Sequence, residues 1–265
     1  MKVVLFCGGQ GMRLREFSEK IPKPMVPIGY RPILWHVMKY YAHFGHKDFI
    51  LCLGYQADTI KDYFVKYNEY VSNDFVYTGG GSNLQLLNKD IDDWRITFVD
   101  TGIASNIGQR LKAVEKYVNG EEMFLANYSD GLTDLPLPAM IDQFKASGKT
   151  AMFMASQPTR SFHVARVDKN NRVTELSSLA NSGLRINAGY FALRPSIFDY
   201  INPGEELVEQ PFQRLIARDE LMAYPHDGTF LTMDTFKEKQ MLDDMYAKGD
   251  RPWEVWRTET FQRSA

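Results

Sequence analysis

The sequence predicts an α/β fold in which a largely parallel sheet carries helices on both faces. Apolar, β-branched runs of strand length alternate with segments of helical periodicity from residue 3 to residue 155. Glycine-rich or polar loops follow several of the expected strands. The chain has 265 residues, which is enough to bury a large core and is near the upper limit for one domain. We therefore expect residues 1–265 to form a single domain.

The elements of this alternation follow from periodicity and from helix-start signals. A strand at 3–6 precedes a helix at about 32–44, where Pro32 suits the first turn and apolar residues recur at core-facing spacings. The polar stretch from 68 to about 88, which includes three consecutive glycines, is expected to be irregular. The other elements expected before residue 156 are strands at 48–53, 95–99, 123–126 and 150–155, and helices at 57–67, 110–118 and 138–146.

After residue 155 the pattern changes. Two short apolar runs at 164–167 and 172–176 flank Asp168-Lys169-Asn170-Asn171, which indicates a hairpin. A further strand is expected at 187–193 and a helix at 235–248.

Composition excludes several classes of protein. The formal charge of −2 argues against a nucleic-acid partner, because such domains normally carry a basic excess. No early segment resembles a signal peptide, and no run approaches the roughly 20 apolar residues of a membrane span. Cys7 and Cys52 each lie in an expected strand, which is typical of core filling in a reducing cytoplasm. His36 and His43 are interpreted as ordinary helix residues, since no third ligand stands at zinc-binding spacing. We expect a cytoplasmic protein with no membrane or nucleic-acid partner.

The loop after the first strand has the features of a phosphate site. Gly8, Gly9 and Gly11 let backbone N–H groups approach an anion without obstruction from a Cβ atom. Arg13 and Lys23, the latter between two prolines, add the full charges that a polyphosphate needs. A glycine-rich turn with incidental charges is the alternative. The combination of glycines and cations favours a nucleoside triphosphate, with a C-terminal part that binds a second substrate.

Two commoner phosphate motifs do not fit this loop. A Walker A loop requires Gly-Lys-Ser or Gly-Lys-Thr, whereas Gly11 is followed by Met12. A dinucleotide fingerprint requires a third small residue where Leu14 stands, and an acidic residue after the second strand, which instead runs into Gly54. An NAD-dependent oxidoreductase is therefore disfavoured.

Two aspartates stand where strands are expected to end. Asp130 follows the strand at 123–126, and Asp234 lies where another strand gives way to a helix. Two carboxylates together with phosphate oxygens suit Mg²⁺, which prefers hard oxygen ligands. A helix N-cap at Asp234 and a turn at Asp130 are equally open alternatives.

With these residues in hand, the chain resembles the sugar-1-phosphate nucleotidyltransferases, and most closely the glucose-1-phosphate cytidylyltransferases. The resemblance covers nearly the whole length. It rests on the following blocks: Gly8-Gly9-Gln10-Gly11-Met12-Arg13, Pro22-Lys23-Pro24-Met25, Pro32-Ile33-Leu34-Trp35-His36, Val99-Asp100-Thr101-Gly102, Tyr128 with Asp130-Gly131, Ile186-Asn187-Ala188-Gly189-Tyr190-Phe191 and Met233-Asp234-Thr235.

The resemblance implies a Rossmann-like three-layer α/β/α sandwich with a mostly parallel mixed sheet, as in nucleotide-diphospho-sugar transferases, usually within a homo-oligomer. Residues up to about 155 would bind the nucleotide, and residues from about 156 to 265 would bind the sugar phosphate. The roles that it implies are nucleotide binding by Gly8, Gly9 and Gly11, substrate binding by Met12 and Tyr128, phosphate binding by Arg13 and Lys23, Mg²⁺ binding by Asp130 and Asp234, base contact by Arg110 and sugar contact by Asn187. Arg13, Lys23 and Asp130 would be the catalytic residues.

The implied reaction is attack of a sugar-1-phosphate, glucose-1-phosphate in the closest branch, on the α-phosphorus of CTP, with release of pyrophosphate. The attacking phosphate is already mostly dianionic at pH 7, so that no protein base is required. Arg13, Lys23 and Mg²⁺ supply the charge that this anion–anion reaction needs. The alternatives are the same chemistry with dTTP, UTP or another sugar, and a non-catalytic regulator that binds a nucleotide sugar.

Three positions depart from the family pattern. Family members commonly carry Glu-Lys-Pro after the hairpin, and here no lysine occurs between Lys169 and Lys237. Arg185 either replaces that cation at the sugar phosphate or is a solvated loop residue. Met12 stands for the usual threonine, and Gln109 for a glycine beside Arg110.

Overall fold

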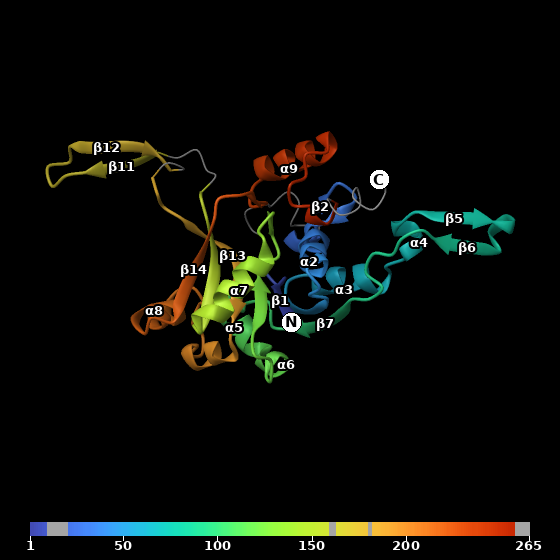
Figure 1. Cartoon of the computed structure of the whole chain (residues 1–265), viewed down its shortest axis with the longest axis horizontal. Coiled ribbons are helices and arrows are strands. Elements are labelled where there is room, and N and C mark those ends of the chain that lie inside the picture. The colour runs from blue at the N-terminus through green and yellow to red at the C-terminus, as the bar shows by residue number, and fades with distance from the viewer. Residues whose placement is uncertain (10–20, 159–162, 180–181, 258–265) are drawn as a thin grey trace.

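A seven-stranded mixed sheet organises the chain (Figure 1). The computed structural model describes residues 1–9, 21–158, 163–179 and 182–257. In the sheet order β14-β10-β13-β8-β1-β4-β7, β13 runs antiparallel to β8 and β10, and every other pair is parallel. The strands are β1 (Lys2–Phe6), β4 (Asp48–Leu53), β7 (Arg95–Asp100), β8 (Phe124–Asn127), β10 (Ala151–Ser156), β13 (Ile186–Leu193) and β14 (Leu221–His226). The mostly parallel sheet predicted from the sequence is confirmed.

Four two-stranded pairs and a set of helices surround this sheet. The pairs are β2 (Pro27–Ile28) with β3 (Arg31–Pro32), β5 (Phe75–Thr78) with β6 (Asn83–Leu86), β9 (Gly131–Thr133) with β15 (Phe230–Thr232), and β11 (His163–Val167) with β12 (Val173–Ser178). The α-helices are α2 (Ile33–His43), α3 (Ala57–Val65), α4 (Glu69–Ser72), α5 (Ile107–Ala113), α6 (Glu115–Val118), α7 (Leu137–Ser147), α8 (Gln210–Ala217) and α9 (Phe236–Lys248). Short 3₁₀ turns lie at η2 (Lys23–Met25), η3 (Gly79–Gly81), η5 (Pro195–Tyr200) and η6 (Val255–Arg257).

Alternation along β1 divides the apolar interior into two cores. Val3 and Leu5 pack into the core that α2, α3, α7 and α9 cover, whereas Val4 and Phe6 face the core under α5, α6 and α8. Each fully buried aliphatic or aromatic side chain contributes about 1.5–3 kcal/mol relative to an exposed one. The result is the three-layer α/β/α sandwich. No helix in the described ranges has the length and apolar content to cross a membrane.

The two cysteines are buried and unbridged, as core filling predicts. Cys52 lies in β4, and Cys7 follows β1 and donates its backbone N–H to the Cys52 carbonyl. Burial raises the pKa of the Cys7 thiol to about 12, which keeps the thiol protonated and unreactive.

The expectation of an irregular stretch after residue 67 is wrong. This stretch contains α4 and the β5–β6 hairpin, which extends from one end of the molecule while β11–β12 extends from the other (Figure 1). The turn between β5 and β6 consists of Gly79, Gly80 and Gly81, all with positive φ. Both strands of this hairpin are almost entirely exposed, so that no alternation of buried and exposed residues marks them in the sequence.

His36 illustrates how tightly α2 is packed. Its ring is 2% exposed, its Nε2–H donates to the Ile28 carbonyl at 3.1 Å, and its Nδ1 has no partner in the described part of the chain. The rings of Trp35, Trp253 and Tyr246 lie around it. Burial lowers the pKa of His36 to about 4, against the raising effect of the Ile28 hydrogen bond. The imidazole is therefore neutral in the folded protein at pH 7.

We predict that this imidazole makes the protein acid-sensitive. Because the folded pKa lies below the unfolded value near 6.5, the stabilisation is complete above pH 6.5 and is lost as pH falls toward 4. The loss that belongs to His36 amounts to about 3 kcal/mol in the free energy of unfolding. Urea titrations of wild type and His36→Gln at several pH values between 7 and 4 give the free energy of unfolding as a function of pH. The difference between the two slopes measures the contribution of His36. The exposed His163→Gln variant serves as the control, and equal slopes in wild type and His36→Gln would contradict the prediction.

Candidate active site

The order in which the chain adds strands to the sheet reverses at β1. The chain places β4 on one side of β1 and β8 on the other, so that the loops after these strands diverge at their carboxyl ends. In open α/β sheets, ligands bind at such a switch point. Gly8 and Gly9 follow β1, and Asp130 follows β8. The glycine loop and one predicted carboxylate therefore share one edge of the sheet.

A strained turn positions Asp130. Ser129 has a φ of 64°, a left-handed conformation that a residue with a Cβ rarely adopts. Its N–H donates to Asn127 Oδ1 at 2.7 Å, and its hydroxyl donates to the Phe6 carbonyl at 2.8 Å. The turn thus ties the end of β8 to the end of β1. Strain of this kind, held by surrounding hydrogen bonds, is typical of functional sites.

Pairing of β9 with β15 brings the second carboxylate to the first. Thr232 lies opposite Gly131 in this pair, and the Met233 N–H donates to the Asp130 carbonyl at 3.3 Å. Asp234 follows directly. Residues that are far apart in the sequence therefore become neighbours.

Asp234 is not the N-cap of α9, so that alternative from the sequence is wrong. Thr235 is the N-cap, and it forms a capping box with Glu238. The Glu238 carboxylate accepts from the N–H groups of both Thr235 and Asp234. The carboxylate of Asp234 is consequently not used to cap the helix.

Lys23 joins the two carboxylates. It is the first residue of η2, between Pro22 and Pro24, and its ammonium donates to Asp130 Oδ2 and to Asp234 Oδ1, each at 2.6 Å. The side chains are 14%, 28% and 23% exposed for Lys23, Asp130 and Asp234 respectively. We call these three residues the Lys23 cluster. Its formal charge is one positive against two negative.

The charges within the Lys23 cluster perturb one another. Burial lowers the pKa of Lys23, but the attraction of Asp130 and Asp234 outweighs it and leaves the pKa above its ordinary value. Burial raises the pKa of Asp130, and Asp234 adds to that rise while Lys23 opposes it. The ammonium therefore opposes burial and the second carboxylate, the two influences that raise the pKa of Asp130.

The donor set of the cluster fits a magnesium ion that brings further ligands with its substrate. Asp130 and Asp234 present hard carboxylate oxygens to one point, and Mg²⁺ in phosphoryl-transfer sites is held by one or two carboxylates plus phosphates. No set of three or more His, Cys, Asp or Glu side chains suited to a metal occurs within the described ranges. The fit is to a shared protein–substrate site rather than a protein-only cage.

Arg110 supports the loop after β1. Its guanidinium is 2% exposed and donates to the Gly8 carbonyl at 2.9 Å, to the Leu53 carbonyl at 3.1 Å and to the Thr101 hydroxyl at 2.7 Å. These bonds join the ends of β1, β4 and β7. In this structure the side chain is thus engaged with the backbone that carries the glycines, and its role beside a base stays a prediction.

The family departure at Gln109 has a local structural reason. Asn106 is the N-cap of α5, its side chain accepts the Gln109 N–H, and Gln109 Oε1 accepts the Asn106 N–H, each at 2.9 Å. Glutamine at this position completes a capping box and fixes the helix that presents Arg110.

The remaining predicted residues lie on and around β13. Asn187 Oδ1 accepts the Gly189 N–H at 2.9 Å, and the Asn187 side chain lies beside the Tyr128 phenol. Arg185 donates to Asp227 at 2.7 Å and to the carbonyls of Ala155 and His226. Arg185 is therefore an ion-paired residue rather than a freely solvated one. Gly11, Met12 and Arg13 lie outside the described residues.

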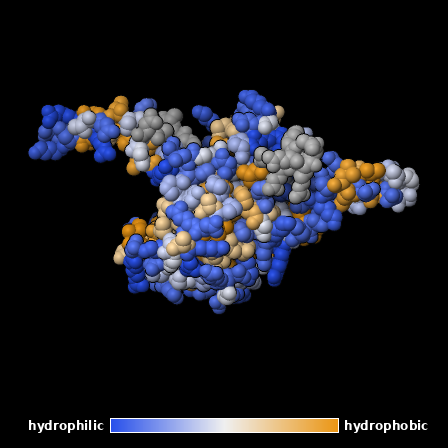
Figure 2. Space-filling view, in the orientation of Figure 1, coloured by the Kyte–Doolittle hydropathy of each residue, from blue (hydrophilic) through white to orange (hydrophobic). Residues whose placement is uncertain are grey.

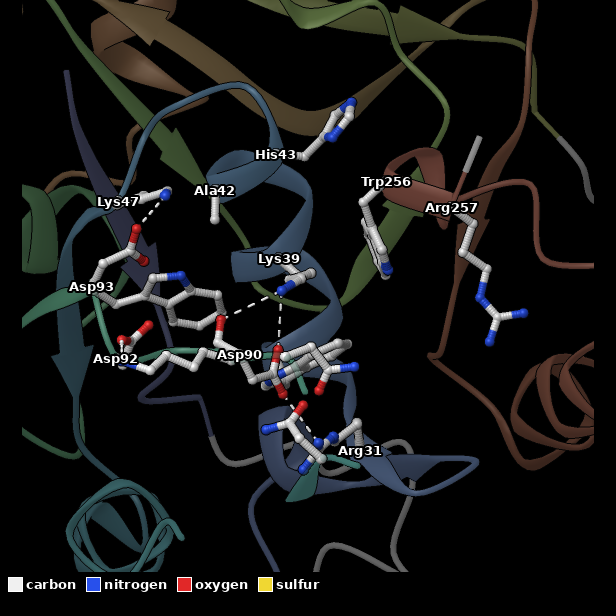
Figure 3. Close-up of a pocket in the computed structure, with 15 residues that line it drawn as sticks. Arg31, Lys39, Ala42, His43, Lys47, Asp90, Asp92, Asp93, Trp256 and Arg257 are labelled. Atoms are coloured by element: carbon white, nitrogen blue, oxygen red, sulfur yellow. Dashed lines mark hydrogen bonds and ion pairs between the residues drawn. The ribbon is translucent and has the colours of Figure 1, made fainter. Parts of the chain in front are cut away.

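A cleft of about 630 Å³ beside α2 contains none of the predicted site residues (Figure 3). Its cations are matched by carboxylates: Asp90 accepts from Arg31 and from Lys39, each at 3.0 Å, and Lys47 pairs with Asp93. Asp90 is 7% exposed, so that this network is part of the packing of α2. Sequence reasoning missed it, because only the fold brings Asp90 to the helix.

Substitution by alanine should affect stability very differently at the two glycines of the loop that the structure describes. A Cβ at Gly8 would lie 2.0 Å from Arg110 Nη1, whereas a Cβ at Gly9 would meet no atom of the described residues within 4 Å. Gly8→Ala must displace the guanidinium from its acceptors and should lower the free energy of unfolding by about 2 kcal/mol or more. Gly9→Ala is the matched control and should change it by less than about 0.5 kcal/mol. Chemical denaturation measures both, and equal stabilities would contradict the support that we assign to Arg110.

Comparison with known proteins agrees with this geometry. The family model described as nucleotidyl transferase matches residues 2–234. Glucose-1-phosphate cytidylyltransferase of Salmonella typhi is 40% identical over 257 residues, which cover 97% of this chain and all of that protein. Mannose-1-phosphate guanyltransferase of Yarrowia lipolytica is 26% identical, over 91% of this chain and 62% of that protein.

The solved structures show the same fold. UDP-glucose pyrophosphorylase without ligand superimposes with a TM-score of 0.70 at 17% identity, covering 94% of this chain and 99% of that one. Since the family model spans most of the chain and the Salmonella enzyme matches it end to end, the chain belongs to the nucleotidyl transferase family.

Proposed function

We propose that this protein transfers the cytidylyl group of CTP to a sugar-1-phosphate, with glucose-1-phosphate as the acceptor, and releases pyrophosphate. The observation that carries the proposal is the convergence of Lys23, Asp130 and Asp234 beside the glycine loop. A carboxylate pair with a lysine at a sheet switch point suits a triphosphate and its metal.

Each residue of the cluster has a role in this proposal. Asp130 and Asp234 would hold Mg²⁺, which when bound neutralises charge on the phosphates of the triphosphate. Lys23 would donate to a phosphate oxygen, and the N–H groups of the loop at Gly8 and Gly9 would bind other oxygens. Arg13 would add a second cation there. Tyr128 and Asn187, whose side chains are neighbours, would line the acceptor side.

No protein base is needed for the attack. A phosphate monoester has a second pKa near 6 and is mostly dianionic at pH 7, so that its oxygen is already a nucleophile. The barrier is the repulsion between this anion and the triphosphate. Fixed positive charge and in-line positioning lower it.

The choice of CTP rests on similarity over the whole chain. The cytidylyltransferase relative matches at 40% identity and the guanyltransferase relative at 26%. The choice of sugar has weaker support, because no lysine occurs between Lys169 and Lys237 and Arg185 is paired with Asp227. The same chemistry with dTTP or UTP, or with another sugar-1-phosphate, is the second candidate.

We also propose that the protein works as a homo-oligomer in the cytoplasm. The β5–β6 hairpin carries exposed apolar side chains, and Figure 2 shows them as an apolar patch at one end of the molecule. Exposed apolar surface of this kind is typical of a protein interface. The buried free thiols Cys7 and Cys52 suit a reducing compartment.

Pyrophosphate release provides the test of the cluster. Lys23→Ala removes a preorganised cation and Asp130→Asn removes a metal ligand, and we expect each to lower kcat at least about 100-fold, or about 3 kcal/mol of barrier. Lys149 and Asp219 form an ion pair of the same 2.6 Å length on the surface, so that Lys149→Ala and Asp219→Asn are matched controls. Near-normal rates in either cluster variant would refute the assigned roles.

Substrate choice is tested by the same assay over four nucleoside triphosphates and a panel of sugar-1-phosphates, with and without Mg²⁺. We expect the highest kcat/KM for CTP with glucose-1-phosphate and no release when either substrate or the metal is omitted. Release that favours UTP or dTTP would replace the proposed base, and no release with any pair would support a non-catalytic regulator.

A further inference from the structure

We infer that Lys23 excludes bare divalent cations from the nucleotide-free site, so that the metal enters together with the triphosphate. The inference rests on the proposed function, because it concerns the order in which the same site is filled. It follows from the position of one ammonium group and from the acceptors that the described residues offer to it.

The ammonium occupies the point at which a metal would have to sit. Lys23 Nζ lies 2.6 Å from a carboxylate oxygen of Asp130 and 2.6 Å from one of Asp234. Mg²⁺ binds oxygens at about 2.0–2.1 Å, so that an ion shared by these two oxygens requires nearly the same position. A dication and an ammonium cannot occupy it together.

Displacement of the lysine is costly while the site holds no nucleotide. The side chain is 14% exposed, and its backbone lies in η2 between Pro22 and Pro24, which restrict movement of the chain. The hydrogen-bond acceptors that the described residues offer to its ammonium are Asp130 and Asp234. An ammonium that leaves both carboxylates would remain largely buried and would lose both counter-charges that the described residues give it, which is strongly unfavourable.

A triphosphate removes this cost. Its oxygens would give the displaced ammonium new acceptors next to the glycine loop, and they would complete the ligand shell of the metal. The same two carboxylates can then exchange one cation for another. Until that exchange, Lys23 also offsets the repulsion between Asp130 and Asp234 and keeps one oxygen of each beside the point that the metal would take.

Binding of Mn²⁺ to the nucleotide-free, full-length protein tests the inference. Mn²⁺ accepts the same carboxylate ligands as Mg²⁺, and electron paramagnetic resonance counts the free ion directly. We expect wild type to bind it weakly and Lys23→Met to bind it at least tenfold more tightly. Lys149→Met, which breaks a surface ion pair of equal length, should match wild type. The double variant Lys23→Met with Asp130→Asn should lose the tenfold gain in Mn²⁺ affinity.

The outcomes separate this inference from the proposed function. If a folded Lys23→Met protein binds Mn²⁺ no better than wild type, the inference is wrong, even when wild type releases pyrophosphate. If Lys23→Met does not fold, Lys23→Gln, which keeps a hydrogen-bond donor without the charge, gives the same comparison. Tight Mn²⁺ binding by nucleotide-free wild type would also overturn the inference. A tenfold gain without pyrophosphate release from any substrate pair would leave the exclusion of bare cations by Lys23 standing and remove the proposed function.

Discussion

The ion pairs between Lys23 and the two aspartates are the interaction on which the rest of the site depends. Three separate segments converge to form them: η2, the turn after β8, and the end of β15. Carboxylates that share a partly buried site repel one another, and Lys23 is a counter-ion that both of them contact. The geometry of this part of the sheet edge is therefore tied to one lysine, which the two flanking prolines hold in place.

The same edge of the sheet contains two other features that position residues of the site and do not by themselves stabilise the fold. Ser129 is held in a left-handed conformation, and Arg110 is buried with backbone carbonyls and a hydroxyl as its acceptors. Both are unfavourable in isolation. Both fix the strand ends that carry Gly8 and Asp130. Away from this edge, the interior follows ordinary rules, with alternating apolar residues divided between two cores.

The sequence predicted the main sheet well because its central strands are buried on both faces and its helices carry strong periodicity. The bounds of β4, for example, are those expected. The β5–β6 hairpin escaped prediction because its residues are exposed, and β14 escaped because it is a partly exposed edge strand that contains a proline. The eight-residue helix α8 was not predicted either. At the site, the types of residue were predictable but their contacts were not. The Thr235-x-x-Glu238 capping box was visible in the sequence and would have excluded Asp234 as the N-cap. The burial of Arg110 depends on three strand ends that only the fold brings together.

A crystal structure of the protein with Mg²⁺ and a non-hydrolysable CTP analogue tests the central claim most directly. The account predicts that one carboxylate oxygen each from Asp130 and Asp234 binds the metal, and that Lys23 Nζ has moved from these oxygens to a phosphate oxygen of the analogue. A metal bound elsewhere, or an analogue seated away from the loop at Gly8 with Lys23 still between the two aspartates, would contradict it.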